Sequence, residues 1–362
     1  IRDLVCVADA GQRIRRVTDA SPWTTQRRRR FPTGQWAALI CRAAWDDAPG
    51  VRSALLTPAD GSRIEHQPGQ FMTFRVPTPA GVVERCYTIS SSAARDGGIE
   101  ITVKRQPGAA SAHLHALMVP GNEVEGFGPS GHFGPHGWPQ GPYALIAAGS
   151  GVTPMLSILR TAADRGLALD AVVVQVAPTP EDMIAADEMA HLARRLPSLT
   201  HIPVMTRATG RPDAALLARL IPDMADRTIL CCGPQPFMEM VRATARDAGV
   251  PPDRYGEESF DFTSPLAEIT PTAETRQRTI TFAKSGKTFP CSETSTILGA
   301  VKAAGLPLPS SCARGMCGIC KTFKHAGEVV MVHDGGIRQR EIDRGFILPC
   351  VSRPLTDIVL DC

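Results

Sequence analysis

The sequence predicts three folded units in series: an antiparallel β-barrel, an α/β unit built on a parallel sheet, and a small α+β unit. Three observations predict this division. The chain has 362 residues, which is too long for one hydrophobic core. Between Trp36 and Trp138, short runs of alternating apolar residues are broken by Gly and Pro. From Tyr143 onward, buried strands alternate with amphipathic helices.

The composition is that of an ordinary globular chain, with 43% apolar residues, 21% charged residues and a net charge of +3. This charge gives no reason to expect a nucleic acid or an acidic membrane surface as a partner. No apolar run reaches the roughly 18 residues that a membrane helix needs. We therefore expect no nucleic-acid partner, no membrane association and a reducing, cytoplasmic location.

Residues 1–35 are polar and Arg-rich, and we interpret them as a basic, mobile N-terminal extension. The stretch that begins at Arg27, RRRRFPTGQWAALICRAAW, superficially resembles a twin-arginine export signal. Pro32 and Gly34 come at once, however, and Arg42 interrupts the apolar residues, so the apolar segment of such a signal is not formed.

The barrel is expected over residues 36–140. Its strands are predicted where apolar and polar residues alternate between turn residues, in the runs VRSALLTP, GQFMTFRVP, RCYTISSS and IEITVKRQPG. The parallel-sheet unit is expected over residues 141–262, with strands predicted at 143–148, 169–178, 200–210 and 227–232. Helices are predicted after the glycine turn at 149–151 and over 180–197, 211–221 and 235–249.

Residues 263–277 are rich in Pro and Thr and have few large apolar side chains, so they read as a linker. The third unit is expected over residues 278–362. It begins with a predicted β-hairpin, RTITFAKSGKTFPC, continues with a predicted helix, STILGAVKAAG, and closes with short strands.

The third unit carries a cysteine loop. Of the 11 cysteines, seven are scattered and are interpreted as buried or inert thiols, namely Cys6, Cys41, Cys86, Cys231, Cys232, Cys291 and Cys362. The other four are spaced C-x4-C-x2-C-x29-C, namely Cys312, Cys317, Cys320 and Cys350. Thiolates ligate iron–sulfur clusters, and three close ligands with one distant ligand is the plant-type [2Fe–2S] arrangement.

The loop also holds Gly315 and Gly318, which permit the tight backbone that wraps such a cluster. The rival interpretations are a four-thiolate zinc site and inert cysteines. Structural zinc usually takes its ligands as two close pairs, whereas here three ligands share one loop. The spacing therefore favours the cluster. A plant-type cluster carries one electron at a low potential, roughly −400 mV, so it acts as a relay.

A glycine turn lies between a predicted strand and helix, at Gly149-Ser150-Gly151-Val152-Thr153-Pro154. Such a turn lets a pyrophosphate approach the backbone and the helix N-terminus. The third glycine of the dinucleotide fingerprint is missing, so taken alone the turn is equally compatible with an ordinary strand–helix connection. A second turn at Cys232-Gly233-Pro234 would border the same crevice.

The barrel run RCYTISSS places Arg85 and Tyr87 on one face of a strand and Thr88 and Ser90 on the other. An arginine beside an aromatic ring suits a phosphate together with a flat ring. Downstream, a helix start at Ser111 offers another anion site. An ordinary barrel strand with a surface arginine remains the alternative for this stretch.

Taken together, these motifs resemble the ferredoxin–NADP reductase superfamily, and more closely the reductases of Rieske-type oxygenases with a C-terminal ferredoxin domain. The resemblance covers residues 36–362 and implies a flavin-binding barrel, an NAD(P)H-binding α/β domain and a β-grasp ferredoxin domain. It implies that Tyr87, Cys232 and Glu258 are catalytic. It implies a second set as cofactor-binding residues, namely Arg85, Tyr87, Thr88, Ser90, Lys104, Gly108, Ser111, Gly149, Gly151, Thr153, Pro154, Cys232, Gly233, Pro234 and Phe260. It implies that the four spaced cysteines hold the cluster.

Related sequences often have Asn-Arg-Thr where this chain has Ala177-Pro178-Thr179, and the acidic residues Glu181 and Asp182 follow. The missing arginine predicts NADH rather than NADPH. The residues after Gly108 look more like the FAD branch than the FMN branch, so we expect FAD, with FMN as the alternative. The last 36 residues or so resemble reductases that serve oxygenases demethylating quaternary amines such as glycine betaine.

A hydride brings two electrons and the cluster accepts one, so a flavin belongs between them. The hypothesis is a reductase that passes electrons from NADH through the flavin and the cluster to the Rieske centre of a partner oxygenase. Arg314, Lys321 and Lys324 near the cysteine loop either meet an acidic face of the partner or are solvated charges. Two alternatives are a reductase for a diiron hydroxylase or hybrid-cluster protein, and a non-enzymatic zinc-binding module.

Overall fold

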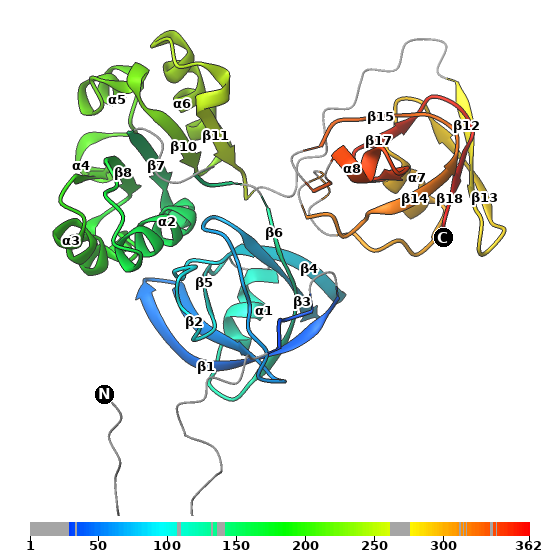
Figure 1. Ribbon diagram of the computed structural model, residues 1–362, viewed down its shortest axis with the longest axis horizontal. Coiled ribbons are helices and arrows are strands. Elements are labelled where there is room, and N and C mark those ends of the chain that lie inside the picture. Colours follow the sequence, from blue (N-terminus) through cyan, green and yellow to red (C-terminus); the bar gives the residue numbers. More distant parts are fainter. Residues whose placement is uncertain are drawn as a thin grey trace, which may run out of the picture.

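The computed structural model describes residues 29–32, 35–106, 110–131, 133–135, 142–260, 276–310, 313, 315, 317–333, 336–337 and 339–362. Within these ranges it contains an antiparallel sheet, a parallel sheet and a mixed sheet, each in its own part of the sequence (Figure 1). The predicted fold class is thereby confirmed.

The first sheet is a barrel with the strand order β4-β3-β6-β1-β2-β5, and neighbouring strands are antiparallel. Its strands are β1 (Ala37–Ala48), β2 (Val51–Pro58), β3 (Phe71–Thr78), β4 (Gly81–Thr88), β5 (Ile99–Lys104) and β6 (Glu123–Ser130). A bridge between Ile89 and Ile101 joins the two edges. Helix α1 (Ala110–Leu117) inserts Leu114 into the buried core.

Part of the predicted extension belongs to the barrel. The backbone N–H of Phe31 donates to the carbonyl of Arg63 at 2.9 Å, and the Phe31 ring is buried in the barrel core. Residues 1–28 and 33–34 lie outside the described residues. The position of Phe31 shows that the barrel core recruits an aromatic side chain from within the Arg-rich stretch.

The second sheet is parallel and has the order β11-β10-β7-β8-β9. Its strands are β7 (Tyr143–Ala148), β8 (Ala171–Ala177), β9 (Leu199–Met205), β10 (Thr228–Cys232) and β11 (Tyr255–Glu258). Its helices are α2 (Val152–Asp164), α3 (Ala186–Arg195), α4 (Thr206–Thr209), α5 (Ala214–Leu220) and α6 (Gln235–Asp247). Short 3₁₀ turns occur at Gly149–Gly151, Pro180–Asp182, Met224–Asp226 and Pro252–Arg254.

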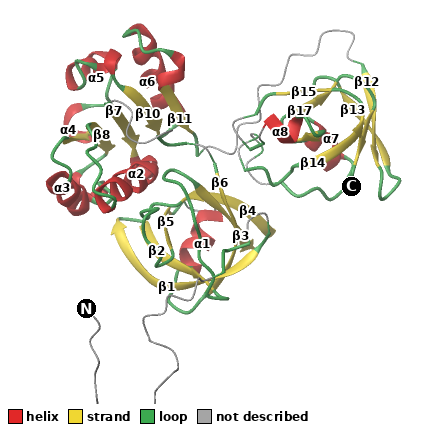
Figure 2. Ribbon diagram, in the orientation of Figure 1, coloured by secondary structure: helices red, strands yellow, loops and turns green. Residues whose placement is uncertain are grey.

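The parallel sheet has an apolar core on each face, as its nearly continuous apolar strands require. Leu145 of β7 packs in one core with α2 and α3, whereas its neighbour Ile146 packs in the other with α5 and α6. Figure 2 shows the helices on the two sides of these strands.

Two predicted elements differ in extent from the observed ones. The predicted helix over 180–197 is a 3₁₀ turn followed by α3, because Ala185 adopts a left-handed conformation with φ of 55° that interrupts a continuous helix. The predicted strand over 200–210 ends at Met205. Its last residues form α4, where the Thr209 hydroxyl donates to the Met205 carbonyl at 3.0 Å.

The third unit is a mixed sheet of order β13-β12-β18-β14-β16, in which β12 and β18 are parallel. Its strands are β12 (Gln277–Phe282), β13 (Thr288–Ser292), β14 (Thr322–Ala326), β16 (Phe346–Ile347) and β18 (Ile358–Leu360), and β15 (Val329–Met331) pairs separately with β17 (Ser352–Pro354). The unit also contains α7 (Ile297–Ala303) and α8 (Gln339–Ile342). Ile297 and Val301 of α7 pack on the sheet core. Most of the predicted linker, residues 261–275, lies outside the described residues.

Candidate functional site

The barrel and the parallel sheet meet where β4 and β11 end. The Thr88 hydroxyl donates to Glu258 Oε2 over 3.5 Å, and both side chains are buried. Thr88 is the last residue of β4 and Glu258 is the last residue of β11, beside Cys232 of β10. The carboxyl ends of the parallel strands thus face the barrel strand that carries the RCYT motif, which is where α/β sheets bind ligands.

Along β4 and the two residues after it, the burial of the side chains rises toward Ser90 and does not alternate, because Ile89 is buried as well. Thr88 and Ser90 are buried, whereas Arg85 is exposed and Tyr87 is half-buried. The Arg85 guanidinium donates to the Glu84 carbonyl at 2.8 Å, so its other donors remain available to an anion. The Tyr87 ring lies 6.1 Å from the Phe74 ring, and burial raises the pKa of Tyr87 to about 12. Tyr87 is therefore a neutral, fixed aromatic surface at physiological pH.

The remaining barrel residues predicted to bind cofactor lie near the end of β5. Lys104 is exposed at the last position of that strand. Ser111 lies in the first turn of α1, and its hydroxyl accepts a hydrogen bond from the backbone N–H of Gln106 at 3.1 Å. Gly108 lies outside the described residues.

The glycine turn after β7 approaches β10 closely. A Cβ on Gly151 would lie 2.2 Å from the carbonyl oxygen of Cys232, so only glycine fits there. The Thr153 hydroxyl donates to the Ser150 carbonyl at 2.9 Å and fixes the turn, and Pro154 is buried in the first turn of α2. The two turns that the sequence predicted to border one crevice are thus in direct contact.

Cys232 is fully buried, and burial, together with the nearby charge of Glu258, raises the pKa of its thiol. The thiol is therefore neutral at physiological pH. Gly233 leaves room for the Phe237 ring, because a Cβ there would lie 2.8 Å from a ring carbon. Pro234 immediately precedes α6, and its ring directs the chain into the first turn of that helix.

Glu258 is 3% exposed, and burial raises its pKa to about 8, although the Thr88 hydroxyl partly opposes the shift. A carboxyl group with this pKa can hold or release a proton near neutral pH. Phe260, two residues later, is half-buried and packs against the core beneath α2.

In the described part of the cysteine loop (residues 312–320), Cys320 lies beside Cys350. Cys317, Cys320 and Cys350 are all buried, and the sulfurs of Cys320 and Cys350 lie 3.2 Å apart. That separation is far longer than the roughly 2.05 Å of a disulfide. Cys312 lies outside the described residues. Among the residues that the structure describes, no group of three or more metal-binding side chains converges on one point.

Both glycines that the sequence singled out in this loop have a left-handed backbone, with φ of 72° at Gly315 and 73° at Gly318. A Cβ on Gly318 would also lie 2.6 Å from the carbonyl oxygen of Gly336. Both positions therefore have the backbone conformation for which the sequence predicted glycine. The loop buries thiols that a metal–sulfur cluster would need.

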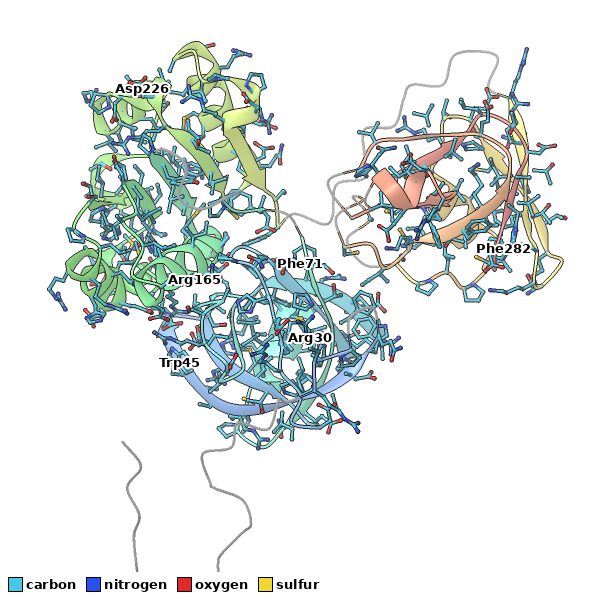
Figure 3. The ribbon with its side chains drawn as sticks, viewed as in Figure 1. Arg30, Trp45, Phe71, Arg165, Asp226 and Phe282 are labelled. Carbon is cyan, nitrogen blue, oxygen red and sulfur yellow. The ribbon has the colours of Figure 1, made fainter. Side chains whose placement is uncertain are left out.

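The cysteine loop also contacts the barrel. Buried Cys317 and Phe71 pack together, with half-buried Cys86 and Ile319 beside them. Phe71 begins β3, and Figure 3 labels it on the side of the barrel nearest the third unit. The sequence pattern around Phe71 did not predict this contact, because it is that of an ordinary barrel strand.

The basic side chains near the loop are partly engaged within the chain. Lys321 forms an ion pair with Glu341 at 2.7 Å, and the Lys324 ammonium donates to the Gly327 carbonyl at 2.5 Å. Arg314 lies outside the described residues. Within the described part of the chain, no helix has the length and apolar character needed to cross a membrane.

Comparison with known families assigns each unit. Residues 51–134 match an oxidoreductase FAD-binding domain, and residues 145–243 match an oxidoreductase NAD-binding domain. Residues 280–355 match a 2Fe–2S iron–sulfur cluster binding domain. The expected cofactors FAD, NADH and [2Fe–2S] are confirmed by these matches.

Several curated proteins are similar along most of their length. The stachydrine N-demethylase reductase subunit of Rhizobium meliloti strain 1021 is 36% identical, over 89% of this chain and 96% of that protein. The glycine betaine monooxygenase reductase subunit of Pseudomonas aeruginosa strain UCBPP-PA14 is 34% identical, over 82% and 87%. Among solved structures, phthalate dioxygenase reductase is 26% identical with a TM-score of 0.59, over 91% of this chain and 100% of that one.

Proposed function

Because the chain belongs to the family of FAD- and [2Fe–2S]-containing reductase subunits of oxygenases, we propose that it carries electrons from NADH to the Rieske centre of a partner oxygenase. One observation carries the proposal. Thr88 contacts Glu258 of the parallel sheet, and its cross-strand neighbour Phe71 contacts Cys317 of the cysteine loop. One pair of barrel residues thus touches both the nucleotide side and the cluster side.

This arrangement suits the electron count of the cofactors. When bound, FAD accepts the two electrons of a hydride and releases them singly, and the [2Fe–2S] cluster carries one at a time. The barrel must therefore lie between the other two units, and the contacts of Thr88 and Phe71 support that position.

The chain's own residues divide the work as follows. Arg85 offers its outward guanidinium to a flavin phosphate, and Tyr87 presents a neutral ring to the flavin. The backbone of Gly149 and Gly151 approaches the NADH pyrophosphate. The further flavin contacts are Thr88, Ser90, Lys104, Gly108 and Ser111, and the further nicotinamide contacts are Thr153, Pro154, Cys232, Gly233, Pro234 and Phe260. The cluster ligands are Cys312, Cys317, Cys320 and Cys350.

Glu258 is proposed to hold or move a proton beside the reacting rings. Its buried carboxyl and its hydrogen bond with Thr88 support this role, because a group with a pKa of about 8 changes protonation near the working pH. The functional units are proposed to span residues 36–140, 141–262 and 278–362, after a basic extension and on either side of a linker at 263–277.

The final substrate of the partner is proposed to be a quaternary amine of the betaine type. The similarity to reductase subunits named for glycine betaine and stachydrine, over more than four-fifths of the chain, supports this. A cytoplasmic location is proposed as well, and the free thiols of Cys41, Cys231, Cys232 and Cys291 in the described part of the chain support it.

An anaerobic titration with NADH tests the relay. Bleaching of the flavin absorption together with a reduced [2Fe–2S] signal in low-temperature electron paramagnetic resonance is expected. Flavin bleaching without the cluster signal would contradict the relay. Reconstitution with a betaine-type oxygenase, with a diiron hydroxylase as the control acceptor, then tests the partner. Faster turnover of the diiron acceptor would replace the Rieske assignment.

A further inference from the structure

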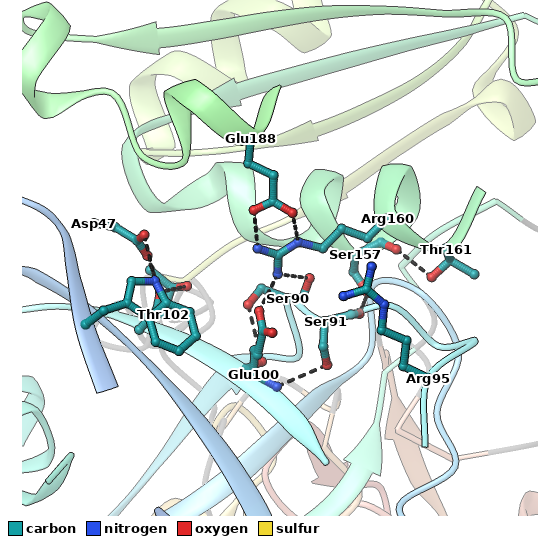
Figure 4. A network of polar contacts seen from close by, with 12 residues as sticks. Asp47, Ser90, Ser91, Arg95, Glu100, Thr102, Ser157, Arg160, Thr161 and Glu188 are labelled. Atoms are coloured by element: carbon teal, nitrogen blue, oxygen red, sulfur yellow. Dashed lines mark hydrogen bonds and ion pairs between the residues drawn. The ribbon is translucent and has the colours of Figure 1, made fainter. Parts of the chain in front are cut away.

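A mostly buried arginine side chain joins the barrel to the parallel-sheet unit (Figure 4). The Arg160 side chain, on α2, is 11% exposed. Its Nη1 donates to the Ser90 carbonyl at 2.8 Å and to Glu100 Oε2 at 2.7 Å, both on the barrel. Its Nε and Nη2 form a bidentate ion pair with the carboxylate of Glu188 on α3. One guanidinium thus holds two carboxylates that belong to different units.

Other side chains on the same face of α2 also contact the barrel, along residues 90–95. The Ser157 hydroxyl donates to the Ser91 carbonyl at 2.9 Å, and the Thr161 hydroxyl accepts from the Ala93 backbone N–H at 2.9 Å. Arg95 forms an ion pair with Asp164 at 2.6 Å. Residues 157, 160, 161 and 164 recur at helical spacing, so these contacts form one continuous seam along the helix.

Both sides of this seam lead directly to the cofactor-binding elements. Helix α2 begins at the Gly149–Gly151 turn, and at 1.5 Å per residue Arg160 lies about 10 Å along the axis from Thr153. On the barrel side, Ser90 is two residues after Thr88. Any slip of α2 along residues 90–95 would therefore move the nucleotide turn relative to the flavin strand.

Such a slip is expected to matter because reactions between two bound rings depend steeply on their separation. A misplacement of about 1 Å can cost roughly 100-fold in rate. Breaking a buried, hydrogen-bonded ion pair also leaves its partners uncompensated. Glu100 and Glu188 would then repel each other across the boundary, which would open the seam at its middle.

We propose that Arg160 is a positioning residue that sets the separation of the nicotinamide and flavin sites by locking α2 to residues 90–95. The expected effect on FAD reduction rests on the proposed function. The locking of α2 to residues 90–95 does not. In this role the Arg160 side chain contacts neither the Gly149–Gly151 turn nor the Cys232–Pro234 turn. It acts through Ser90 on one side and through its own helix on the other.

The chain offers a matched control in Arg227. This guanidinium is also buried and also binds two carboxylates and one carbonyl, those of Asp223, Asp170 and Tyr143. All of these partners lie within the parallel-sheet unit, at the amino ends of β7, β8 and β10 and away from the site. Replacing Arg227 thus removes the same kind of interaction without touching the seam.

The experiment compares Arg160→Met with Arg227→Met in the FAD-loaded protein. Hydrogen–deuterium exchange of the peptide covering residues 89–96 reports on the seam, and anaerobic stopped-flow reduction of FAD by NADH reports on positioning. Arg160→Met is expected to raise exchange in this peptide and to slow FAD reduction, each by at least about tenfold. Arg227→Met is expected to lower the unfolding temperature and to change neither readout.

A second pair of variants keeps the test decisive should Arg160→Met not fold. Glu100→Gln removes a contact across the seam, whereas Glu188→Gln removes one within the parallel-sheet unit. Only Glu100→Gln is expected to speed exchange at Ala93. Unchanged exchange in Arg160→Met, or in Glu100→Gln should Arg160→Met not fold, would overturn the proposal. Faster exchange with unchanged FAD reduction would overturn the positioning role, and a wild type that NADH does not reduce would instead overturn the proposed function.

Discussion

Thr88 and Glu258 are 170 residues apart in the sequence, and their side chains share a hydrogen bond of 3.5 Å across the boundary between the barrel and the parallel sheet. Each ends the strand that carries it. The contact places a hydrogen-bond partner of a buried carboxyl on the strand with the flavin motif. The protonation of Glu258 is thereby linked to the position of β4.

The stability of the protein is predicted to depend on pH through Glu258. Burial raises its pKa to about 8, so the folded protein keeps a proton that an unfolded glutamate loses near pH 4.5. The wild type therefore loses stability as the pH rises from about 4.5 to about 8, and no more above that. Glu258→Gln removes this loss. The stability of the variant relative to the wild type is therefore expected to be higher at pH 8.5 than at pH 5, by at most about 5 kcal/mol. Urea unfolding at the two pH values measures the difference.

Glu181→Gln is the control for this prediction. Glu181 is exposed, and the nearby Thr179 side chain lowers its pKa, so its removal gives no gain in stability with rising pH. Equal pH dependence in Glu258→Gln and the wild type would show that Glu258 is ionised in the folded state.

Replacing a cluster ligand is predicted to separate the two halves of the relay. Cys317→Ser, Cys320→Ser and Cys350→Ser are each expected to lose iron and the reduced [2Fe–2S] signal, because serine does not replace a thiolate ligand well. NADH should still bleach the FAD, since the other two units are intact. Cys362→Ser, in the same unit but outside the ligand spacing, should retain full iron content. Full electron delivery by Cys317→Ser without a cluster would contradict the relay.

Gly151→Ala is predicted to weaken nucleotide binding while leaving FAD in place. The new Cβ would lie 2.2 Å from the Cys232 carbonyl oxygen, so the turn after β7 must move away from β10. The dissociation constant for NAD⁺, which binds the same turn without reducing the FAD, is expected to rise at least tenfold, as measured by titration of the oxidised protein with NAD⁺. Gly97→Ala, where a Cβ meets nothing within 4 Å, is the matched control. Unchanged binding in Gly151→Ala would exclude this turn from the nucleotide site.

The preference for NADH is predicted to reside in the segment after β8. The Thr179 hydroxyl donates to Asp182 at 3.0 Å, and the negative charge of Glu181 next to it repels a 2′-phosphate. Pro178→Arg combined with Glu181→Gln is expected to shift the ratio of kcat/KM for NADH over NADPH at least tenfold toward NADPH. Either single change should shift it less. A wild type that already prefers NADPH tenfold would refute the assignment of this segment.

Much of the fold was predictable because its signals are local. Alternation over eight residues identified β2, and the glycine turn between an apolar run and an amphipathic helix identified β7 and α2. The spacing of the cysteines predicted the cluster unit in the same way. The helix predicted over 180–197 was wrong at its start, because the left-handed Ala185 is a property of the packed chain and not of an alanine-rich sequence.

The sequence by itself determined the order of the three units and the ligand spacing of the cluster, because periodicity and spacing act over a few residues. The flavin and nucleotide classes followed from the resemblance of its motifs to a known family. Only the tertiary structure decided which of those residues meet. The pairing of Thr88 with Glu258, the packing of Phe71 on Cys317, and the bridge from Arg160 to Glu100 and Glu188 all join distant segments. Burial of a carboxyl or a guanidinium depends on such contacts, so the raised pKa of Glu258 and the seam along α2 became visible only in the folded chain.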